Sequence, residues 1–247
     1  MLQCCARTFN VKPGRAADLK MSQLPKLNKG NLSEQVYGTI RASLMDGRYE
    51  PGERLTIASL AEQLGVSITP VREAIFRLVT ERALEMRAAT SIQVRSLTPP
   101  ELREIQLIRH LLEGEAAAQA ALKISRKDLT RLEVLQTDFT NAAASDPLEA
   151  SRVNREFHFK LADAAEMPLL YATIESMWAQ MGPLIHLYHL NTPTRVLVSG
   201  THGHYDVLRA LAVRDPEAAR RAIQADIGVG SVMVEWLEAK EAAEAAS

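Results

Sequence analysis

The sequence predicts a mainly α-helical protein with two domains, a small N-terminal helical domain that carries one β-hairpin and a C-terminal all-α antiparallel bundle. Three observations support this fold class. Apolar residues recur with the spacing of amphipathic helices along most of the chain after residue 30. The alternation of apolar and polar residues that is typical of a strand is confined to residues 83–95. Two consecutive prolines, Pro99 and Pro100, interrupt the helical pattern and mark the boundary between the domains.

The first predicted element is a helix that begins near residue 31 and ends at Gly47. Its apolar face consists of residues four apart, Leu32, Val36, Ile40 and Leu44. Glycine suits the left-handed conformation in which many helices end. Residues 49–55 then form a turn-rich connector to the next element.

Residues 56–78, TIASLAEQLGVSITPVREAIFRL, predict two short helices joined by a tight turn. Gly65 tolerates positive φ at the end of the first helix, and Ser67 or Thr69 can cap the second. The buried stripe of the second helix consists of Val71, Ile75 and Leu78. Its outward side carries the groups that we expect to contact DNA in the major groove, Ser67, Ile68, Thr69, Arg72 and Arg77.

The helix-turn-helix pattern alone does not distinguish a DNA reader from an ordinary helical hairpin in an all-α core. The residues that follow favour the DNA reader. Residues 83–87 and 91–95 alternate between apolar and polar, which predicts a small β-hairpin, or wing. A helix, a helix-turn-helix and a hairpin in this order make a winged helix-turn-helix domain, which we assign to residues 30–96.

These motifs resemble the N-terminal domain of the GntR family of bacterial transcription regulators. The family typically shows PG..L....LA..LGVSRTPVREAL..L, and the matching stretch here is PGERLTIASLAEQLGVSITPVREAIFRL. The resemblance implies that the second helix binds a double-stranded DNA operator. Ile68 stands where the family usually has arginine, so an apolar contact, for example with a thymine methyl group, takes the place of a polar one. The wing tip at residues 88–91 lacks the usual glycine.

Charge is divided unevenly along the 247 residues, a length that suits two compact cores. Residues 1–96 hold 14 Lys and Arg against 9 Asp and Glu, a net charge of +5. Residues 97–247 hold 15 against 21, a net charge of −6. A basic domain favours DNA phosphates, whereas an acidic domain is repelled by them. The division therefore agrees with DNA reading by residues 30–96 and a different task for residues 97–247.

The C-terminal domain is predicted to consist of six helical segments without any strand. They span about residues 101–121, 127–141, 147–165 and 168–189, followed by a final two that meet near Asp215–Pro216. Connections this short favour neighbouring helices that run in opposite directions, which predicts an antiparallel bundle.

Four polar residues inside the bundle form a candidate metal site. Asn154 and His158 are four residues apart and therefore project from the same face of one helix. His204 and Asp226 are each 11 residues from Asp215, so they face each other if Asp215 forms the turn of a helical hairpin. Two imidazole nitrogens and two oxygen donors suit a divalent transition metal such as zinc or nickel. From spacing alone, the alternative is a set of buried, hydrogen-bonded polar groups or surface residues.

The same residues resemble the FCD effector domain of the FadR subfamily, in which an (Asp/Asn)-x-x-x-His pair and two later histidines commonly bind a metal. Asn154, His158 and His204 match this pattern, and Asp226 stands where the last histidine is usual. The resemblance implies a pocket for a small carboxylate above the metal. It also implies that Arg109, in a segment similar to the family's R..LE, binds this effector. The alternative is that Arg109 forms an ordinary surface ion pair with Glu113.

Residues 1–29 are rich in Lys, Arg, Pro and Gly, and we expect them to form a disordered tail. Cys4 and Cys5, the only cysteines, are adjacent in this tail and cannot frame a disulfide scaffold. No stretch approaches the roughly 18 apolar residues of a membrane helix, and the N-terminus lacks the apolar core of a signal peptide. We therefore expect a cytoplasmic protein without a membrane partner.

Together these features and the resemblance predict a ligand-responsive transcription regulator, more specifically a repressor, and not an enzyme. The resemblance and the two-fold symmetry of pseudo-palindromic operators imply a homodimer. The effector is expected to be a small carboxylate or sugar acid. The alternative is a metal-dependent enzyme fused to a nucleic-acid-binding module. No recognisable nucleophile or acid–base pair accompanies the candidate ligands, so the sequence favours the regulator.

Overall fold

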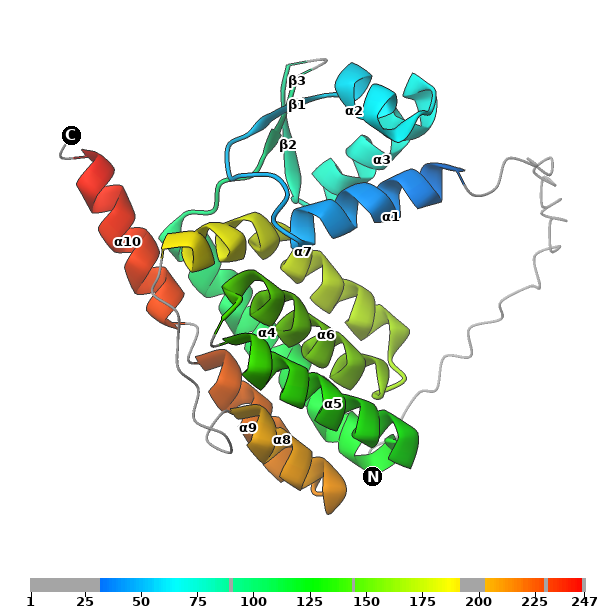
Figure 1. Cartoon of the computed structure of the whole chain (residues 1–247), viewed down its shortest axis with the longest axis vertical. Coiled ribbons are helices and arrows are strands. Elements are labelled where there is room, and N and C mark those ends of the chain that lie inside the picture. The colour runs from blue at the N-terminus through cyan, green and yellow to red at the C-terminus, as the bar shows by residue number, and fades with distance from the viewer. Residues whose placement is uncertain (1–31, 89–90, 144, 192–202, 229–230, 246–247) are drawn as a thin grey trace, which may run out of the picture. The chain divides into compact units, whose positions relative to one another are not determined.

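The computed structural model describes residues 32–88, 91–143, 145–191, 203–228 and 231–245 (Figure 1). All of these described residues belong to one structural unit. The predicted tail at residues 1–29, including Cys4 and Cys5, lies outside the described residues, as do residues 89–90 of the wing tip.

The N-terminal part of this unit has the winged helix-turn-helix fold that the sequence predicts. Its elements are α1 (Leu32–Met45), β1 (Arg54–Thr56), α2 (Ile57–Leu64), α3 (Ile68–Thr80), β2 (Leu84–Ala88) and β3 (Ser91–Val94). The strands form an antiparallel sheet in the order β1-β3-β2, with Leu55 opposite Ile92. The sequence did not predict β1, because a strand of three residues is too short for alternation to be recognised.

The turn between α2 and α3 is fixed by the backbone. Gly65 has a positive φ, as predicted, with a value of 64°. This left-handed conformation lets Val66 N donate to Ala61 O at 3.0 Å. Thr56 caps α2 by accepting a hydrogen bond from Ser59 N at 3.1 Å. The predicted cap of α3 is wrong in one respect, because Ser67 stands at the N-cap position without a capping hydrogen bond from its side chain.

The predicted buried stripe of α3 is confirmed, since Val71, Ile75 and Leu78 are completely buried. In α1, the predicted face is buried from Val36 onward. Leu32, in contrast, is 48% exposed, because it is the first residue of α1 and lies one turn before the helix meets the core. The recognition helix α3 is therefore held from behind by an apolar contact with α1, which leaves its other side exposed.

The C-terminal part comprises seven helices in the portion of the chain that the structure describes. They are α4 (Pro99–Lys123), α5 (Arg126–Ala143), α6 (Pro147–Asp163), α7 (Pro168–Asn191), α8 (Gly203–Ala212), α9 (Pro216–Gly228) and α10 (Ser231–Ala245). The prediction of six segments was wrong at the C-terminal end, where α10 is a separate helix. Gly228 is the last residue of α9, and glycine is unfavourable inside a helix.

The two prolines at the boundary begin α4 instead of preceding it. Thr98 and Glu101 form a reciprocal capping box, and Pro99 occupies the first turn, where a missing N–H costs no intrahelical hydrogen bond. The helix therefore starts two residues earlier than predicted.

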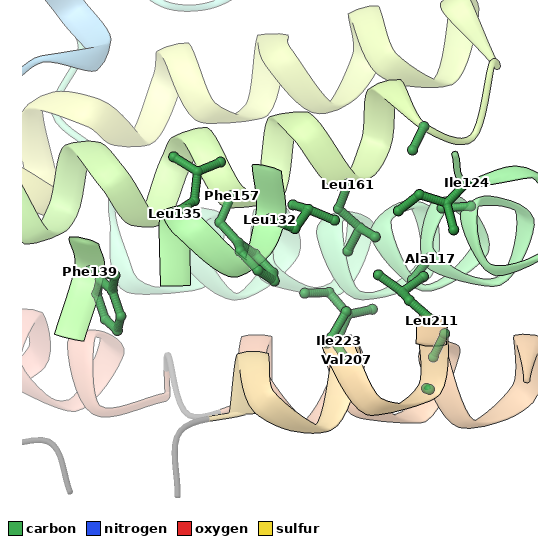
Figure 2. Packing of buried hydrophobic residues seen from close by; sticks show 14 of the residues in the cluster. Ala117, Ile124, Leu132, Leu135, Phe139, Phe157, Leu161, Val207, Leu211 and Ile223 are labelled. Atoms are coloured by element: carbon green, nitrogen blue, oxygen red, sulfur yellow. The ribbon is translucent and has the colours of Figure 1, made fainter. Parts of the chain in front are cut away.

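The largest core cluster lies between α4, α5, α6, α8 and α9 (Figure 2). Small residues on α4 allow α9 to approach closely. Ala117 is completely buried in this contact, and a Cβ atom on Gly114 would lie 2.6 Å from Gln224 Nε2. This packing matters for the candidate site, because it fixes α9 against the helices that carry the other polar residues. Across the described segments, no helix has both the length and the apolar character needed to cross a bilayer.

Candidate metal centre and DNA-reading helix

Three polar side chains from three helices converge in the interior of the bundle. They are His158 on α6, His204 on α8 and Asp226 on α9, and one ligand atom from each lies within 4.8 Å of the others. His158 Nε2 is 3.4 Å from Asp226 Oδ2, and His204 Nε2 is 3.7 Å from the same oxygen. Both histidines are buried, and the Asp226 side chain is 10% exposed.

The hairpin of α8 and α9 brings His204 and Asp226 together. Arg214 adopts a φ of 57° at the turn, and the Asp215 carboxylate accepts a hydrogen bond from Ala218 N at 2.9 Å, which caps α9. Close approach also requires Gly203 at the start of α8. A Cβ atom there would lie 2.7 Å from Asp226 Oδ1 and 2.9 Å from Asp226 Cβ.

Each imidazole is oriented by an oxygen on the opposite side of its ring. His158 Nδ1 lies 2.6 Å from Glu113 Oε2, and His204 Nδ1 lies 2.7 Å from Gln136 Oε1. An acceptor at Nδ1 favours a proton on that nitrogen, which leaves Nε2, the nitrogen nearer Asp226, available to bind a metal when the ring is neutral. Phe157 stacks on His204 with ring centroids 3.8 Å apart and further restricts that ring.

Arg109 and Glu113 form a buried ion pair beside this group. Arg109 Nε donates to Glu113 Oε1 at 2.6 Å, and the guanidinium lies over the Trp178 ring at 4.2 Å. Trp178 Nε1 donates to the same carboxylate oxygen at 3.3 Å. Arg109 is only 7% exposed, so the alternative of a surface ion pair is wrong.

The charges of this group are strongly coupled. Burial on its own would raise the pKa of the Glu113 carboxyl, but the Arg109 guanidinium and the His158 ring outweigh burial and lower that pKa to about 2. Burial would lower the pKa of His158, yet Glu113 and Asp226 raise it above its ordinary value. The two carboxylates therefore favour a positive charge between them, either a proton on His158 or a metal ion.

The donor set fits a transition metal. The candidate donors are two imidazole nitrogens and one carboxylate oxygen, which lie within 4.8 Å of one another. Zinc sites use these types of ligand, with their imidazole rings oriented by hydrogen bonds. The residues present can therefore hold a metal ion. Asn154, the fourth predicted ligand, lies one turn before His158 on α6 and is partly exposed.

Sequence reasoning missed the residues that support the ligands. Gln136 lies between Leu132 and Phe139, in the stretch of α5 that packs into the core. A polar residue among buried apolar ones is unusual, and this pattern could have indicated that Gln136 has a role in the site. Nothing in the sequence indicates that Trp178 belongs to the site, because a tryptophan in a helix bundle is usually part of the hydrophobic core.

The predicted DNA-contacting residues all lie on the outer side of α3 or in the turn before it. Ser67, Thr69 and Arg72 are exposed, and Ile68 is 49% exposed. Arg77 differs from these, since its guanidinium already contacts Glu34 at 2.6 Å and covers the Tyr37 ring at 3.6 Å. Phe76, which sequence reasoning did not single out, is 51% exposed on the same helix.

A separate cavity of about 330 Å³ lies where the C-terminal end of α1 meets α6 and α7. Its lining includes Arg48, Arg152, Arg155 and His186 as well as the acidic residues Asp46 and Glu149. None of the predicted metal or effector residues lines it.

Comparison with known proteins matches both parts of the chain. Residues 32–94 match the family model described as bacterial regulatory proteins, gntR family, and residues 104–228 match the FCD domain. The HTH-type transcriptional regulator McbR of Escherichia coli (strain K12) is 36% identical over 200 residues, which cover 80% of this chain and 90% of McbR. The solved structure of E. coli McbR/YncC has a TM-score of 0.77 at 32% identity, over 83% of this chain and 98% of that chain.

Two further relatives from the same organism are more distant. The Exu regulon transcriptional regulator is 27% identical over 78% of this chain and 80% of its own length. The HTH-type transcriptional repressor RspR is 25% identical over 78% of this chain and 84% of its own length. The chain therefore belongs to the GntR family of bacterial transcription regulators, among the members that carry an FCD domain, and it is a regulator of transcription and not an enzyme.

Proposed function

We propose that the protein is a homodimeric repressor that a small carboxylate or sugar-acid metabolite releases from its DNA operator. In this proposal residues 30–96 read the operator, and residues 97–247 sense the metabolite and form the dimer. The observation that carries it is the presence, in one chain, of an exposed recognition helix and a buried group of Arg109, His158, His204 and Asp226. DNA reading also implies a cytoplasmic location.

The sensor is proposed to contain zinc or nickel held by His158, His204 and Asp226, with Asn154 as a fourth donor. When bound, the metal supplies positive charge that attracts an anionic metabolite. The protein itself contributes the orientation of the ligands. Glu113 and Gln136 hold the two rings with Nε2 directed at Asp226, which reduces the entropy lost on binding the ion.

Arg109 is proposed to bind the carboxylate of the metabolite. Its planar guanidinium offers five N–H donors, of which Nε is used by Glu113. Trp178 covers the guanidinium and excludes water from it, which strengthens any ionic contact made there. Because Glu113 already neutralises Arg109, an entering carboxylate must share the arginine with Glu113. We expect this competition to move α4 and α7 relative to each other.

The operator is proposed to be read by Ser67, Ile68, Thr69 and Arg72, which support base contacts because they lie near the exposed N-terminal end of α3. Arg77 lies near the other end of the helix and already contacts Glu34. We therefore assign Arg77 a phosphate contact, which positions the helix without reading sequence.

A dimer with two-fold symmetry would place two recognition helices on the half-sites of a pseudo-palindromic operator. The relative RspR is named a transcriptional repressor, which supports the sign of regulation proposed here.

The test uses an operator duplex that the purified full-length protein selects from random DNA. Its affinity is measured by fluorescence anisotropy with zinc present, alone and with each member of a panel of small carboxylates and sugar acids. We expect one class of compound to weaken binding by about tenfold or more, and we expect Arg109→Met to abolish this effect. Arg103→Met, which removes an exposed arginine from the same helix, serves as the matched control.

Release that persists unchanged in Arg109→Met would remove Arg109 from the effector site. A metabolite that strengthens operator binding would contradict release as the mechanism. A solution mass equal to one chain, measured at the concentrations used for binding, would contradict the dimer.

A further inference from the structure

The DNA-reading and sensing parts of the chain meet where α1 contacts α7. The two helices are in close backbone contact, because a Cβ atom on Gly182 of α7 would lie 2.4 Å from the Leu44 carbonyl oxygen of α1. Two ion pairs flank this contact. Arg155 of α6 donates to Met45 O and to Asp46 Oδ1, both at 2.7 Å. Arg41 of α1 donates through Nη1 to Glu175 Oε2 of α7 at 2.9 Å.

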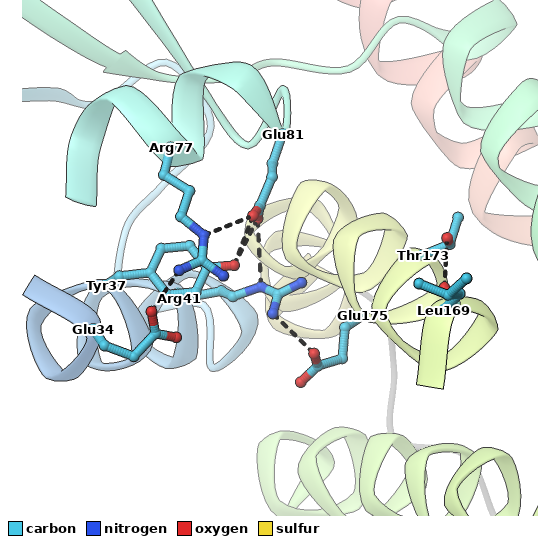
Figure 3. Close-up of polar contacts among 8 residues, drawn as sticks. All are labelled: Glu34, Tyr37, Arg41, Arg77, Glu81, Leu169, Thr173 and Glu175. Atoms are coloured by element: carbon cyan, nitrogen blue, oxygen red, sulfur yellow. Dashed lines mark hydrogen bonds and ion pairs between the residues drawn. The ribbon is translucent and has the colours of Figure 1, made fainter. Parts of the chain in front are cut away.

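Arg41 lies between two carboxylates that belong to different parts of the molecule (Figure 3). On one side is Glu175, and on the other is Glu81, whose Oε2 lies 3.6 Å from Arg41 Nε. Arg41 is 9% exposed, and its buried Nε has no hydrogen-bond partner among the described residues. A buried guanidinium nitrogen without such a partner is costly. A small shift of the side chain toward Glu81 would satisfy it.

Glu81 is the C-cap residue of the recognition helix α3. The single proton of Tyr37 Oη is shared between the two oxygens of this carboxylate, at 2.7 and 2.9 Å, and Arg77 Nε lies 3.6 Å from the carboxylate. Figure 3 shows these contacts converging on one carboxylate. The position of Glu81, and with it the end of α3, therefore depends on cations and a hydroxyl supplied partly by α1.

The other end of this chain of contacts is the candidate sensor. Trp178 follows Glu175 by three residues, about one turn of α7. Its indole contacts Glu113, Arg109 and the His158 ring, whose centroid lies 5.4 Å from that of the indole. A displacement of Trp178 therefore also moves Glu175, because both are on the same rigid helix.

We propose that Arg41 is a positioning residue that transmits the state of the buried His158 group, through Trp178 and Glu175 on α7, to Glu81 at the end of the recognition helix. The proposal rests on the ligand response proposed above. When α7 moves away, Arg41 loses Glu175 and pairs with Glu81. When α7 moves closer, the pair with Glu175 dominates and Glu81 is held by Tyr37 and Arg77 alone. The recognition helix thus has two arrangements, and the sensor selects between them.

Hydrogen exchange measured by mass spectrometry on the full-length protein tests this route, with Zn²⁺ as the probe. Exchange is followed in residues 150–163 of α6, which report on the sensor, and in residues 76–83, which report on the end of α3. In the unaltered protein we expect Zn²⁺ to change exchange in both segments, by about threefold or more in residues 76–83. Arg41→Met and Glu175→Gln should retain the change in α6 and lose the change in residues 76–83.

Arg155→Met is the matched control, because it also removes an arginine that joins α1 to the bundle but does not reach Glu81. This variant should transmit the zinc effect normally. An equal loss of transmission in Arg155→Met would overturn the proposal, since any weakening of the α1 contact would then suffice. Persistence of the effect in Arg41→Met and Glu175→Gln would overturn it as well. A zinc effect confined to α6 in the unaltered protein would support the metal site but contradict the relay.

If Zn²⁺ changes no segment, the metal part of the proposed function fails and a double-mutant cycle decides on the relay. Trp178→Phe removes the indole N–H bond to Glu113, and operator affinity is measured for this variant, for Arg41→Met and for the pair. If the relay exists, the loss of operator affinity in the double variant should differ by about threefold or more from the product of the two single losses. Effects that multiply, or a Trp178→Phe variant with unchanged affinity, would overturn it.

Discussion

At the residue scale, the Glu113 carboxylate contacts three side chains to which different roles are assigned: Arg109, His158 and Trp178. Its Oε1 accepts from Arg109 Nε and Trp178 Nε1, and its Oε2 lies 2.6 Å from His158 Nδ1. A buried carboxylate with this many partners fixes the positions of all of them. Glu113 therefore links the proposed effector residue to the candidate metal ligands.

Replacement of Glu113 by Gln should weaken zinc binding by about 10–100-fold, because His158 loses the carboxylate that orients its ring. The free energy of unfolding should fall by about 3–5 kcal/mol, because Arg109 is left buried without a counter-charge. Chelator competition and denaturant unfolding measure the two effects. Glu115→Gln is the control, since its pair with Arg220 is partly exposed and we expect a loss of less than about 1 kcal/mol. Wild-type zinc affinity in Glu113→Gln would show that His158 needs no such support.

Arg72→Ala should weaken binding to the operator by about 1–3 kcal/mol if Arg72 contacts a base. Binding to random duplex should then change little. Gel-shift titrations on both duplexes provide the measurement, with Arg221→Ala, an exposed arginine on α9, as the control. An equal loss on both duplexes, with a flatter dependence on salt, would instead indicate a phosphate contact. Unchanged binding to both would remove Arg72 from the interface.

At the scale of elements, the helical hairpin of α8 and α9 decides whether the polar residues meet. Gly203 permits the first turn of α8 to lie against Asp226, with no room for a Cβ atom between them. The site therefore depends on backbone packing as well as on the identity of its ligands.

Gly203→Ala should displace Asp226 from the two histidines and lower zinc affinity while the helices remain folded. Gly38→Ala is the matched control, because a Cβ atom at Gly38 meets nothing within 4 Å and alanine favours the helix by about 0.5–1 kcal/mol. Zinc titration and circular dichroism of both variants make the comparison. Equal zinc affinity in Gly203→Ala and the unaltered protein would mean that the hairpin tolerates the methyl group without moving Asp226.

Periodicity in the sequence predicts most elements, because a helix that packs on one side must repeat its apolar residues every three to four positions. The symmetry of a hairpin about Asp215 also anticipates that His204 and Asp226 face each other, whereas the resemblance to the FCD domain implies that His158 joins them. Periodicity misses β1, which is too short to show a period. It also misses Gln136 as a partner of His204, because that contact depends on how α5 is rotated against α8.

At the scale of the whole molecule, the contact of α1 with α7 joins a basic DNA-reading part to an acidic sensing part. This junction contains two ion pairs, a close glycine contact and the apolar packing of Ala179 of α7 against the winged-helix core. An effector-driven change requires a joint whose two arrangements differ by only a few kcal/mol. Such a joint allows ligand binding in one part to alter DNA binding in the other.

The group of His158, His204 and Asp226 is proposed to hold a metal ion. Elemental analysis of protein purified without chelator, combined with thermal melts with and without EDTA, tests this claim. We predict close to one zinc or nickel ion per chain. We also predict a stabilisation of about 2.7 kcal/mol when free metal is at 100 times its dissociation constant. Both effects should be lost in His158→Ala and retained in His110→Ala, a histidine outside the group. Metal-free protein whose melting temperature responds neither to EDTA nor to added zinc or nickel would contradict the claim.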